Sequence, residues 1–226
     1  MSIVVQQTDR PAPDVIKKIS HIPPGELGHY LEFGFLSPEI RPINPVKPFC
    51  GPVVTVRIPP ADSLMVYQAL EYAQPGDVIV VDLQGDERHA CWGEITSIVA
   101  KSRGVLAAII DGPATDSAEI ASLGFGVFAR GLSVLTTKLQ ALGGDVNVPV
   151  TVGGVPVSPG DIALGCADGV LFIPQHAIAE VLEVGKVAET AEEARKERIK
   201  QGGSPLDICG GRDLVKRLNP AYLQRL

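Results

Sequence analysis

The sequence predicts an α/β fold in a single domain, because strand patterns and helix patterns alternate along the chain. Residues 51–58, 78–82 and 105–110 are rich in Val and Ile, as expected of strands that are buried on both faces of a sheet. No linker, repeat or low-complexity tract interrupts this order. We therefore expect one domain over residues 1–226, with a C-terminal helix.

Two helices are expected between these strands, and the first covers residues 62–73. In the second, over residues 93–103, Ile95, Ile98 and Val99 recur at the spacing of one helical stripe. We expect this stripe to face the core.

The two ends of the domain carry further signals. A short helix over residues 14–19 should stop before Pro23 and Pro24, which cannot continue it. Two β-branched runs within residues 148–157 are joined by two glycines, which is typical of a hairpin. Residues 175–201 have a helical pattern that ends in a run of charges. A long helix that covers little of its own core often packs on another subunit, so we expect a homo-oligomer.

Composition excludes several classes of protein. The 226 residues are 45% hydrophobic, which is enough for a large core without disulfides. A net charge of −6 leaves no basic excess for phosphates, so we expect no nucleic-acid partner. No apolar run reaches the roughly 18 residues of a membrane span, and residues 1–7 do not resemble a leader. We expect a cytoplasmic protein with no membrane partner.

The four cysteines are widely scattered and form neither a zinc-binding nor a redox pair. They are Cys50, Cys91, Cys166 and Cys209. We expect reduced thiols with a structural role, although Cys91 lies close to Glu94 in the sequence.

The most informative segment follows the last of the three predicted strands. Residues 111–113, Asp-Gly-Pro, predict a tight turn that delivers Thr115 and Asp116 to the surface. Upstream, Glu94 follows a glycine at the expected start of a helix. Two carboxylates at neighbouring strand and helix ends could hold a divalent cation, so we take a metal-assisted enzyme as the hypothesis to test.

Structural roles are the alternative for each of these residues. Asp116 and Glu119 have the spacing of a helix capping box. Glu94 in a first helical turn is favourable to the helix dipole whether or not it has a function. Trp92 is expected to serve packing, and His89 fits a surface role as well as acid–base chemistry.

Six motifs, in order, resemble the signatures of one family. It is the family of the 4-hydroxy-4-methyl-2-oxoglutarate and 4-carboxy-4-hydroxy-2-oxoadipate aldolases, which also includes the regulator of ribonuclease activity A. The similarity covers about residues 38–208. The motifs lie at residues 75–82, 90–94, 110–116, 128–131, 155–161 and 168–170.

This resemblance implies a swivelling β/β/α-type fold that assembles into trimers or hexamers, with active sites between subunits. It also implies a divalent metal, Mg²⁺ or Mn²⁺, and cleavage of a 2-oxo acid substrate that releases pyruvate. Members of the family also decarboxylate oxaloacetate. The expected function is therefore a metal-dependent lyase.

The resemblance carries over to individual residues. The family signature is an acidic residue, twenty intervening positions and then Arg-Asp. Glu94 takes the first place and Asp116 the metal-binding last place, whereas Thr115 stands where the arginine belongs. Backbone amides at a helix start, which hold the pyruvate in the family, correspond to Glu94 and Ile95, next to Gly93. We thus expect Glu94, Thr115 and Asp116 to be catalytic. The residues expected to bind substrate are Gly93, Glu94, Ile95 and Thr115.

Thr115 argues against the standard substrate of the family, because threonine cannot bind a carboxylate with two parallel hydrogen bonds as an arginine does. Either Arg88, Arg57 or Arg130 compensates from elsewhere, or the substrate lacks the usual carboxylate contact. We place Arg88 among the candidate substrate-binding residues.

Two acidic contributors of the family lie across its subunit interface. Gly28 falls near the place of the first, for which Glu26 or Glu32 could substitute. Glu197, in a C-terminal Arg-Lys-Glu run, resembles the second and is a candidate metal ligand.

Two further functions stay open beside the lyase. One is a noncatalytic binding protein like the ribonuclease regulator, which the loss of the arginine favours. The other is a different metal-assisted reaction in the same pocket, such as hydration or tautomerisation.

Overall fold

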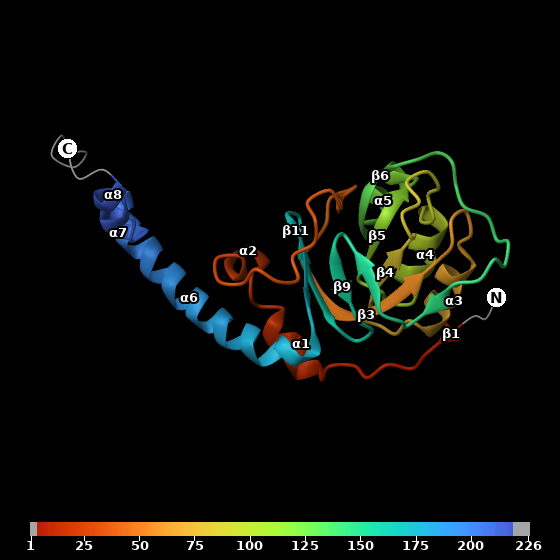
Figure 1. Ribbon diagram of the computed structural model, residues 1–226, viewed down its shortest axis with the longest axis horizontal. Helices are drawn as coiled ribbons and strands as arrows, with labels where there is room; N and C mark the ends of the chain where they lie inside the picture. Colours follow the sequence, from red (N-terminus) through yellow and green to blue (C-terminus); the bar gives the residue numbers. More distant parts are fainter. Residues whose placement is uncertain (1–3, 219–226) are drawn as a thin grey trace.

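A computed structural model describes residues 4–218 of the chain, and its central element is a sheet with four parallel strands (Figure 1). Three helices connect consecutive strands of this set and pack on one face of the sheet. The strands are β3 (Phe49–Arg57), β4 (Val78–Asp82), β5 (Ala107–Ala114) and β6 (Gly126–Leu132). The helices are α3 (Leu64–Tyr72), α4 (Glu94–Ser102) and α5 (Ser117–Leu123).

The opposite face of the sheet is covered by antiparallel strand pairs. These pairs are β8 (Val150–Val152) with β9 (Val155–Val157), and β10 (Ile162–Cys166) with β11 (Gly169–Ile173). β3 takes part in both layers, because its first residues pair with β10 and its last residues with β4. Short strands complete the edges: β1 (Val4–Val5), β2 (Arg41–Pro42) and β7 (Asp145–Val146).

Burial on both faces explains the uninterrupted apolar runs of the strands. In β4, Ile79 and Val81 face the helices, whereas Val78 and Val80 face the antiparallel layer. All four side chains are fully buried. The predicted α/β fold, its three long strands and the glycine-linked hairpin are thereby confirmed.

Two helices that are far apart in the sequence pack together outside the sheet layers (Figure 1). The predicted helices at both ends are confirmed as α1 (Pro13–Ile19) and as α6 (Ile178–Lys200), which follows the short η1 (Gln175–Ala177). Val181, Gly185 and Ala188 are the buried residues of α6, and the later part of the helix projects away from the sheets. Its far end carries α7 (Pro205–Ile208) and α8 (Arg212–Leu218).

A short helix, α2 (Pro24–Leu27), was missed from the sequence. The two prolines end the preceding helix, but Pro24 is also the first residue of the next one. Proline is favoured at this position because its missing N–H would have no intrahelical acceptor there.

The single domain was predicted over residues 1–226, of which 1–3 and 219–226 lie outside the described residues. The segment 1–7, for which the sequence predicts no leader, is described only from residue 4 onward. Within the described range, no helix is both long and apolar enough to cross a membrane.

The predicted buried stripe of α4 is wrong for Ile95 and Ile98, whereas Val99 is partly buried and packs against the core. Ile95 is 62% exposed and Ile98 is 43% exposed, whereas Thr96 and Ser97 are buried together with Ala100. Hydrogen bonds at the start of the helix cause this rotation, because both hydroxyls bind the carbonyl of Gly93.

The predicted tight turn at residues 111–113 is also wrong, because β5 continues through these residues to Ala114. The register with β6 shifts between Ile110 and Pro113. Gly112 serves a close approach rather than a turn, since a Cβ there would lie 2.6 Å from Cδ2 of Leu83.

Burial predicts different reactivities for the four cysteines. It raises the pKa of Cys50 and of Cys91 to about 12, and Cys91 is only 4% exposed. Because the thiolate is the reactive form, Cys91 should resist a thiol reagent in the native protein, whereas the exposed Cys209 should react first. Labelling with Ellman's reagent, compared with Cys209→Ser and with the unfolded chain, measures this. Equal native rates for all four thiols would contradict the burial described here.

Candidate functional site

Asp116 links the end of β5 to the start of α5, and its carboxylate is held by two donors. The backbone N–H of Glu94 donates to Oδ2 at 3.0 Å, and the Thr115 hydroxyl donates to Oδ1 at 3.0 Å. Asp116 adopts a left-handed conformation with φ of 57°. The structure therefore brings together the three residues that the sequence singled out.

The capping-box alternative for Asp116 is wrong. Asp116 is the N-cap residue of α5, but its side chain makes no capping hydrogen bond with that helix. Its carboxylate points instead to the first amide of α4, which follows a different strand.

Gly93 leaves the space that this arrangement needs. A Cβ at this position would lie 2.5 Å from Oδ2 of Asp116 and 2.8 Å from the Thr115 methyl group. Such contacts are too short for any side chain larger than hydrogen. Gly93 thus permits the close approach of the two strand ends.

Buried hydroxyls fix the backbone around Gly93. Thr96 accepts a hydrogen bond from the Gly93 N–H at 2.8 Å, and Ser97 donates to the Gly93 carbonyl at 2.8 Å. The Trp92 indole donates to Ser97 at 2.9 Å and stacks on Phe125. This agrees with a packing role for Trp92. A Thr-Ser pair after Trp-Gly-Glu was the available sequence signal for this network.

Glu94 and Ile95 contribute different groups. The Glu94 amide is already bound to Asp116, whereas its carboxylate has no hydrogen bond or ion pair with any residue of the range 4–218. The Ile95 amide lies in the first turn of α4, where helix geometry provides no intrahelical acceptor. Both groups are thus available to a ligand.

Two of the three candidate arginines are engaged elsewhere. Arg57 binds Asp145 at 2.5 Å. Arg130 binds Asp111 at 2.5 Å and Glu39 at 2.6 Å, and these bonds raise its pKa against the opposing effect of burial.

Arg88 differs from both, because its guanidinium has no partner within the described part of the chain. Its carbonyl accepts a hydrogen bond from the Ser133 hydroxyl at 2.7 Å. The Ser133 N–H in turn donates to the carbonyl of Ala114, next to Thr115. Arg88 therefore belongs to a loop that is tied to the same strand end.

Asp86 organises this loop. Its carboxylate accepts hydrogen bonds from the amides of Arg88, His89 and Ala61, and it binds the His89 ring at 2.8 Å. Burial opposes ionisation, but the hydrogen bonds outweigh it and lower the pKa of Asp86. His89 thus has a defined partner in the loop.

The interface candidates lie away from Asp116. Glu197 is exposed on α6 and accepts a hydrogen bond from Gln201, and Glu32 is exposed as well. Gly28 ends α2. The chain by itself does not bring Glu197 to Asp116, which precedes α5 on the far side of the sheet (Figure 1).

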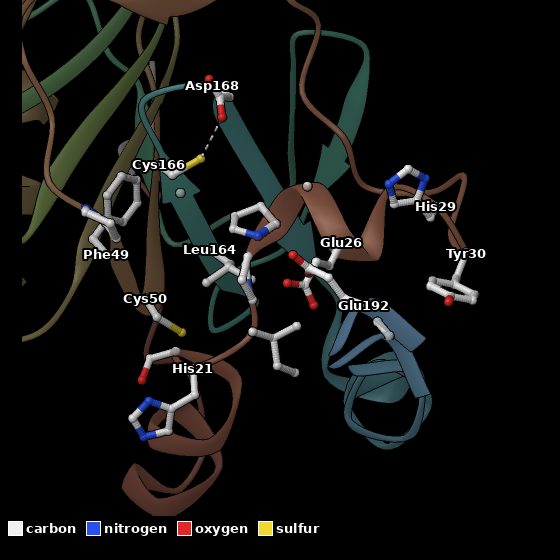
Figure 2. Close-up of a pocket in the computed structure, with 18 of the residues that line it drawn as sticks. His21, Glu26, His29, Tyr30, Phe49, Cys50, Leu164, Cys166, Asp168 and Glu192 are labelled. Atoms are coloured by element: carbon white, nitrogen blue, oxygen red, sulfur yellow. Dashed lines mark hydrogen bonds between the residues drawn. The ribbon is translucent and has the colours of Figure 1, made fainter. Parts of the chain in front are cut away.

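Glu26 lines a separate cleft of about 1080 Å³ between α2, β10 and α6. Figure 2 shows Glu26 and Glu192 facing each other there. A hydrogen bond with Glu192 and burial raise the pKa of Glu26. Neither Asp116 nor Glu94 lines this cleft.

The donor set around Asp116 suits one type of metal. No three His, Cys, Asp or Glu side chains gather in residues 4–218 as they do in a zinc site. Mg²⁺ commonly uses one or two carboxylates and keeps several water molecules. An exposed carboxylate that two donors orient therefore fits Mg²⁺.

Residues 26–172 match the model of the RraA-like family, described as aldolase/RraA. The chain belongs to this family. The match covers the described site and the four parallel strands, and it confirms the resemblance that the motifs indicated.

Two relatives are similar to most of this chain. A protein of Halalkalibacterium halodurans, provisionally named a 4-hydroxy-4-methyl-2-oxoglutarate aldolase, is 37% identical over 73% of this chain and 78% of its own. An uncharacterized protein of Methanocaldococcus jannaschii is 32% identical over 74% of this chain and 84% of its own.

Two solved structures are similar to this chain. The RNA-processing inhibitor RraA from Thermus thermophilus superposes with a TM-score of 0.59 at 28% identity, over 65% of this chain and 88% of its own. A Streptomyces coelicolor member superposes with a TM-score of 0.74 at 23% identity, over 84% of this chain and 99% of its own, and shows the shared fold. The family fold expected from the motifs is confirmed.

Substitution of Gly93 should disturb the site and the stability of the domain. Gly93→Ala places a methyl group on Asp116 and Thr115, so we expect a loss of about 1–3 kcal/mol in the free energy of unfolding. Urea denaturation measures it. The control is Gly131→Ala, where a Cβ meets nothing within 4 Å, and its expected effect is within about 0.5 kcal/mol. Equal stabilities of the two variants would refute the close approach at Gly93.

Proposed function

We propose that this protein is a divalent-metal-dependent lyase that cleaves or decarboxylates a 2-oxo acid and releases pyruvate. The observation that carries the proposal is the Asp116 carboxylate, oriented by two donors at the first turn of α4. Its family, with relatives named as aldolases, supports this assignment.

Asp116 is the residue that would hold Mg²⁺ or Mn²⁺ in this chain. When bound, such a cation supplies Lewis-acid stabilisation of the negative charge that develops on the 2-oxo group. The chain itself contributes the fixed direction of the carboxylate, because its two oxygens are each bound to one donor.

The first turn of α4 would bind the carboxylate of the substrate. The Ile95 amide and the positive end of the helix dipole favour an anion at this position. The half-buried Glu94 carboxylate lacks a partner in the described chain, so it is the candidate that accepts the proton of the substrate hydroxyl. That proton transfer allows the carbon–carbon bond to break.

Arg88 is the candidate that replaces the missing arginine of the motif. It is the one of the three expected arginines whose guanidinium has no partner in the range 4–218, and hydrogen bonds tie its loop to the strand that carries Thr115. In this proposal it binds the second carboxylate of the substrate.

Assembly into a trimer or hexamer would complete the site with Glu197 of another subunit. Exposed apolar side chains beside the site support such an interface, since Val134 is 98% exposed and Leu132 is 59% exposed. The projecting α6 supports it as well.

A noncatalytic regulator is the second candidate function. Thr115 favours it, because a site that clamps no second carboxylate has lost one contact of the aldolases. The structural similarity to the RNA-processing inhibitor RraA agrees with this alternative.

Loss of the Asp116 charge should abolish pyruvate release. Asp116→Asn keeps a residue that tolerates a positive φ but removes the metal-binding charge, so we expect kcat/KM to fall at least about a hundredfold. The assay measures pyruvate from 4-hydroxy-4-methyl-2-oxoglutarate and from oxaloacetate, with Mg²⁺, Mn²⁺ or a chelator. Asp168→Ala, which removes an exposed carboxylate elsewhere, is the control. No turnover by the parent protein, with activity gained in Thr115→Arg, would overturn the lyase for these substrates.

Removal of Arg88 should weaken substrate binding more than turnover. For a dicarboxylate substrate we expect Arg88→Ala to raise KM roughly tenfold, with a smaller change in kcat, because a lost ground-state contact affects KM first. Arg41→Ala, which removes another exposed arginine, is the matched control. Thr115→Arg in the Arg88→Ala background should restore KM. An unchanged KM in Arg88→Ala would exclude Arg88 from the site.

A further inference from the structure

Thr115 makes contacts that define one side-chain orientation. Its N–H donates to the Trp92 carbonyl at 2.9 Å, which fixes its backbone. Its methyl group lies against Gly93, where a Cβ would approach to 2.8 Å. Its hydroxyl donates to Oδ1 of Asp116 at 3.0 Å.

The branched side chain couples the last two contacts. A β-branched residue has few accessible χ1 rotamers, so the position of the methyl group determines that of the hydroxyl. With the methyl group on Gly93, the hydroxyl of Thr115 is directed at Asp116.

The Asp116 carboxylate thus has one donor on each oxygen. The Glu94 amide binds Oδ2 and the Thr115 hydroxyl binds Oδ1. A carboxylate has about four lone-pair directions, so about one remains free on each oxygen. Rotation of the carboxylate would break both hydrogen bonds.

We propose that Thr115 is a positioning residue that orients the Asp116 carboxylate toward a divalent cation. This inference rests on the proposed function, because it gives Thr115 a role in metal binding rather than in substrate contact. The motif has an arginine at this position, whereas in this chain the threonine donates a hydrogen bond to the neighbouring carboxylate.

The matching variants separate the hydroxyl from the shape of the side chain. Thr115→Val keeps the branched shape and removes the hydroxyl, whereas Thr115→Ser keeps the hydroxyl and removes the methyl group. Thr151→Val, at an exposed threonine on β8, is the control for a surface substitution.

The test measures Mn²⁺ affinity of the full chain by electron paramagnetic resonance, together with the melting temperature of each variant. We expect Thr115→Val to bind Mn²⁺ about 10- to 100-fold more weakly, as is usual when a partner of a metal ligand is lost. Thr115→Ser keeps the hydroxyl but loses the methyl group that fixes its direction, so it should lose less affinity than Thr115→Val. Thr151→Val should match the parent protein.

Each other outcome is decisive. Unchanged Mn²⁺ affinity in Thr115→Val, or equal losses in the Val and Ser variants, would overturn the inference and leave the proposed metal site standing. No Mn²⁺ binding by the correctly folded parent protein would overturn the metal site itself, and the inference with it.

Discussion

Burial of the parallel sheet on both faces is the constraint on which the site depends. The helices fill one face and the antiparallel strands fill the other, so the strand interiors are closed to solvent. Polar chemistry is therefore confined to the strand ends. Parallel strands end at the same edge, where Asp116 after β5 meets the first turn of α4 after β4. The hydrogen bond between these two connections fixes the orientation of the Asp116 carboxylate.

The same edge explains the unusual orientation of α4. The backbone at Gly93 needs donors and acceptors, and the hydroxyls of Thr96 and Ser97 supply them from the buried side of the helix. The Gly93 carbonyl also accepts the backbone N–H of Ser97 at 3.1 Å, so three donors hold it at the start of the helix. Ile95 and Ile98 consequently face outward. An apolar surface next to the candidate site is thus a consequence of fixing Gly93.

The sequence predicted those features that depend on neighbouring residues. Apolar runs gave the strands, and the two glycines gave the hairpin, in which Gly153 and Gly154 have φ of 55° and 81°. The sequence singled out Glu94, Thr115 and Asp116 through two family motifs, and the fold brings the three residues together. The stripe of α4 failed because the hydroxyls of Thr96 and Ser97 bind Gly93 within the first turn, a detail that apolar periodicity does not register. The turn at 111–113 failed because β5 continues there beside β6. Only the fold shows that Arg57 and Arg130 are held by Asp145, Asp111 and Glu39.

The ion pairs of Arg130 also restrict how the missing arginine can be replaced. Asp111 pairs in register with Asp82 on β4, and burial and the Asp111 charge raise the pKa of Asp82. Arg130 compensates this accumulation of negative charge, so moving it toward a substrate would leave Asp111 without its cation. The Arg88 guanidinium has no ion-pair partner within the described chain, so its movement would leave no carboxylate unpaired there. The electrostatics of the sheet edge therefore favour Arg88, in the Asp86 loop, over Arg130 as the residue that binds a substrate carboxylate. Thr115 then needs no contact with that carboxylate and can orient Asp116 instead.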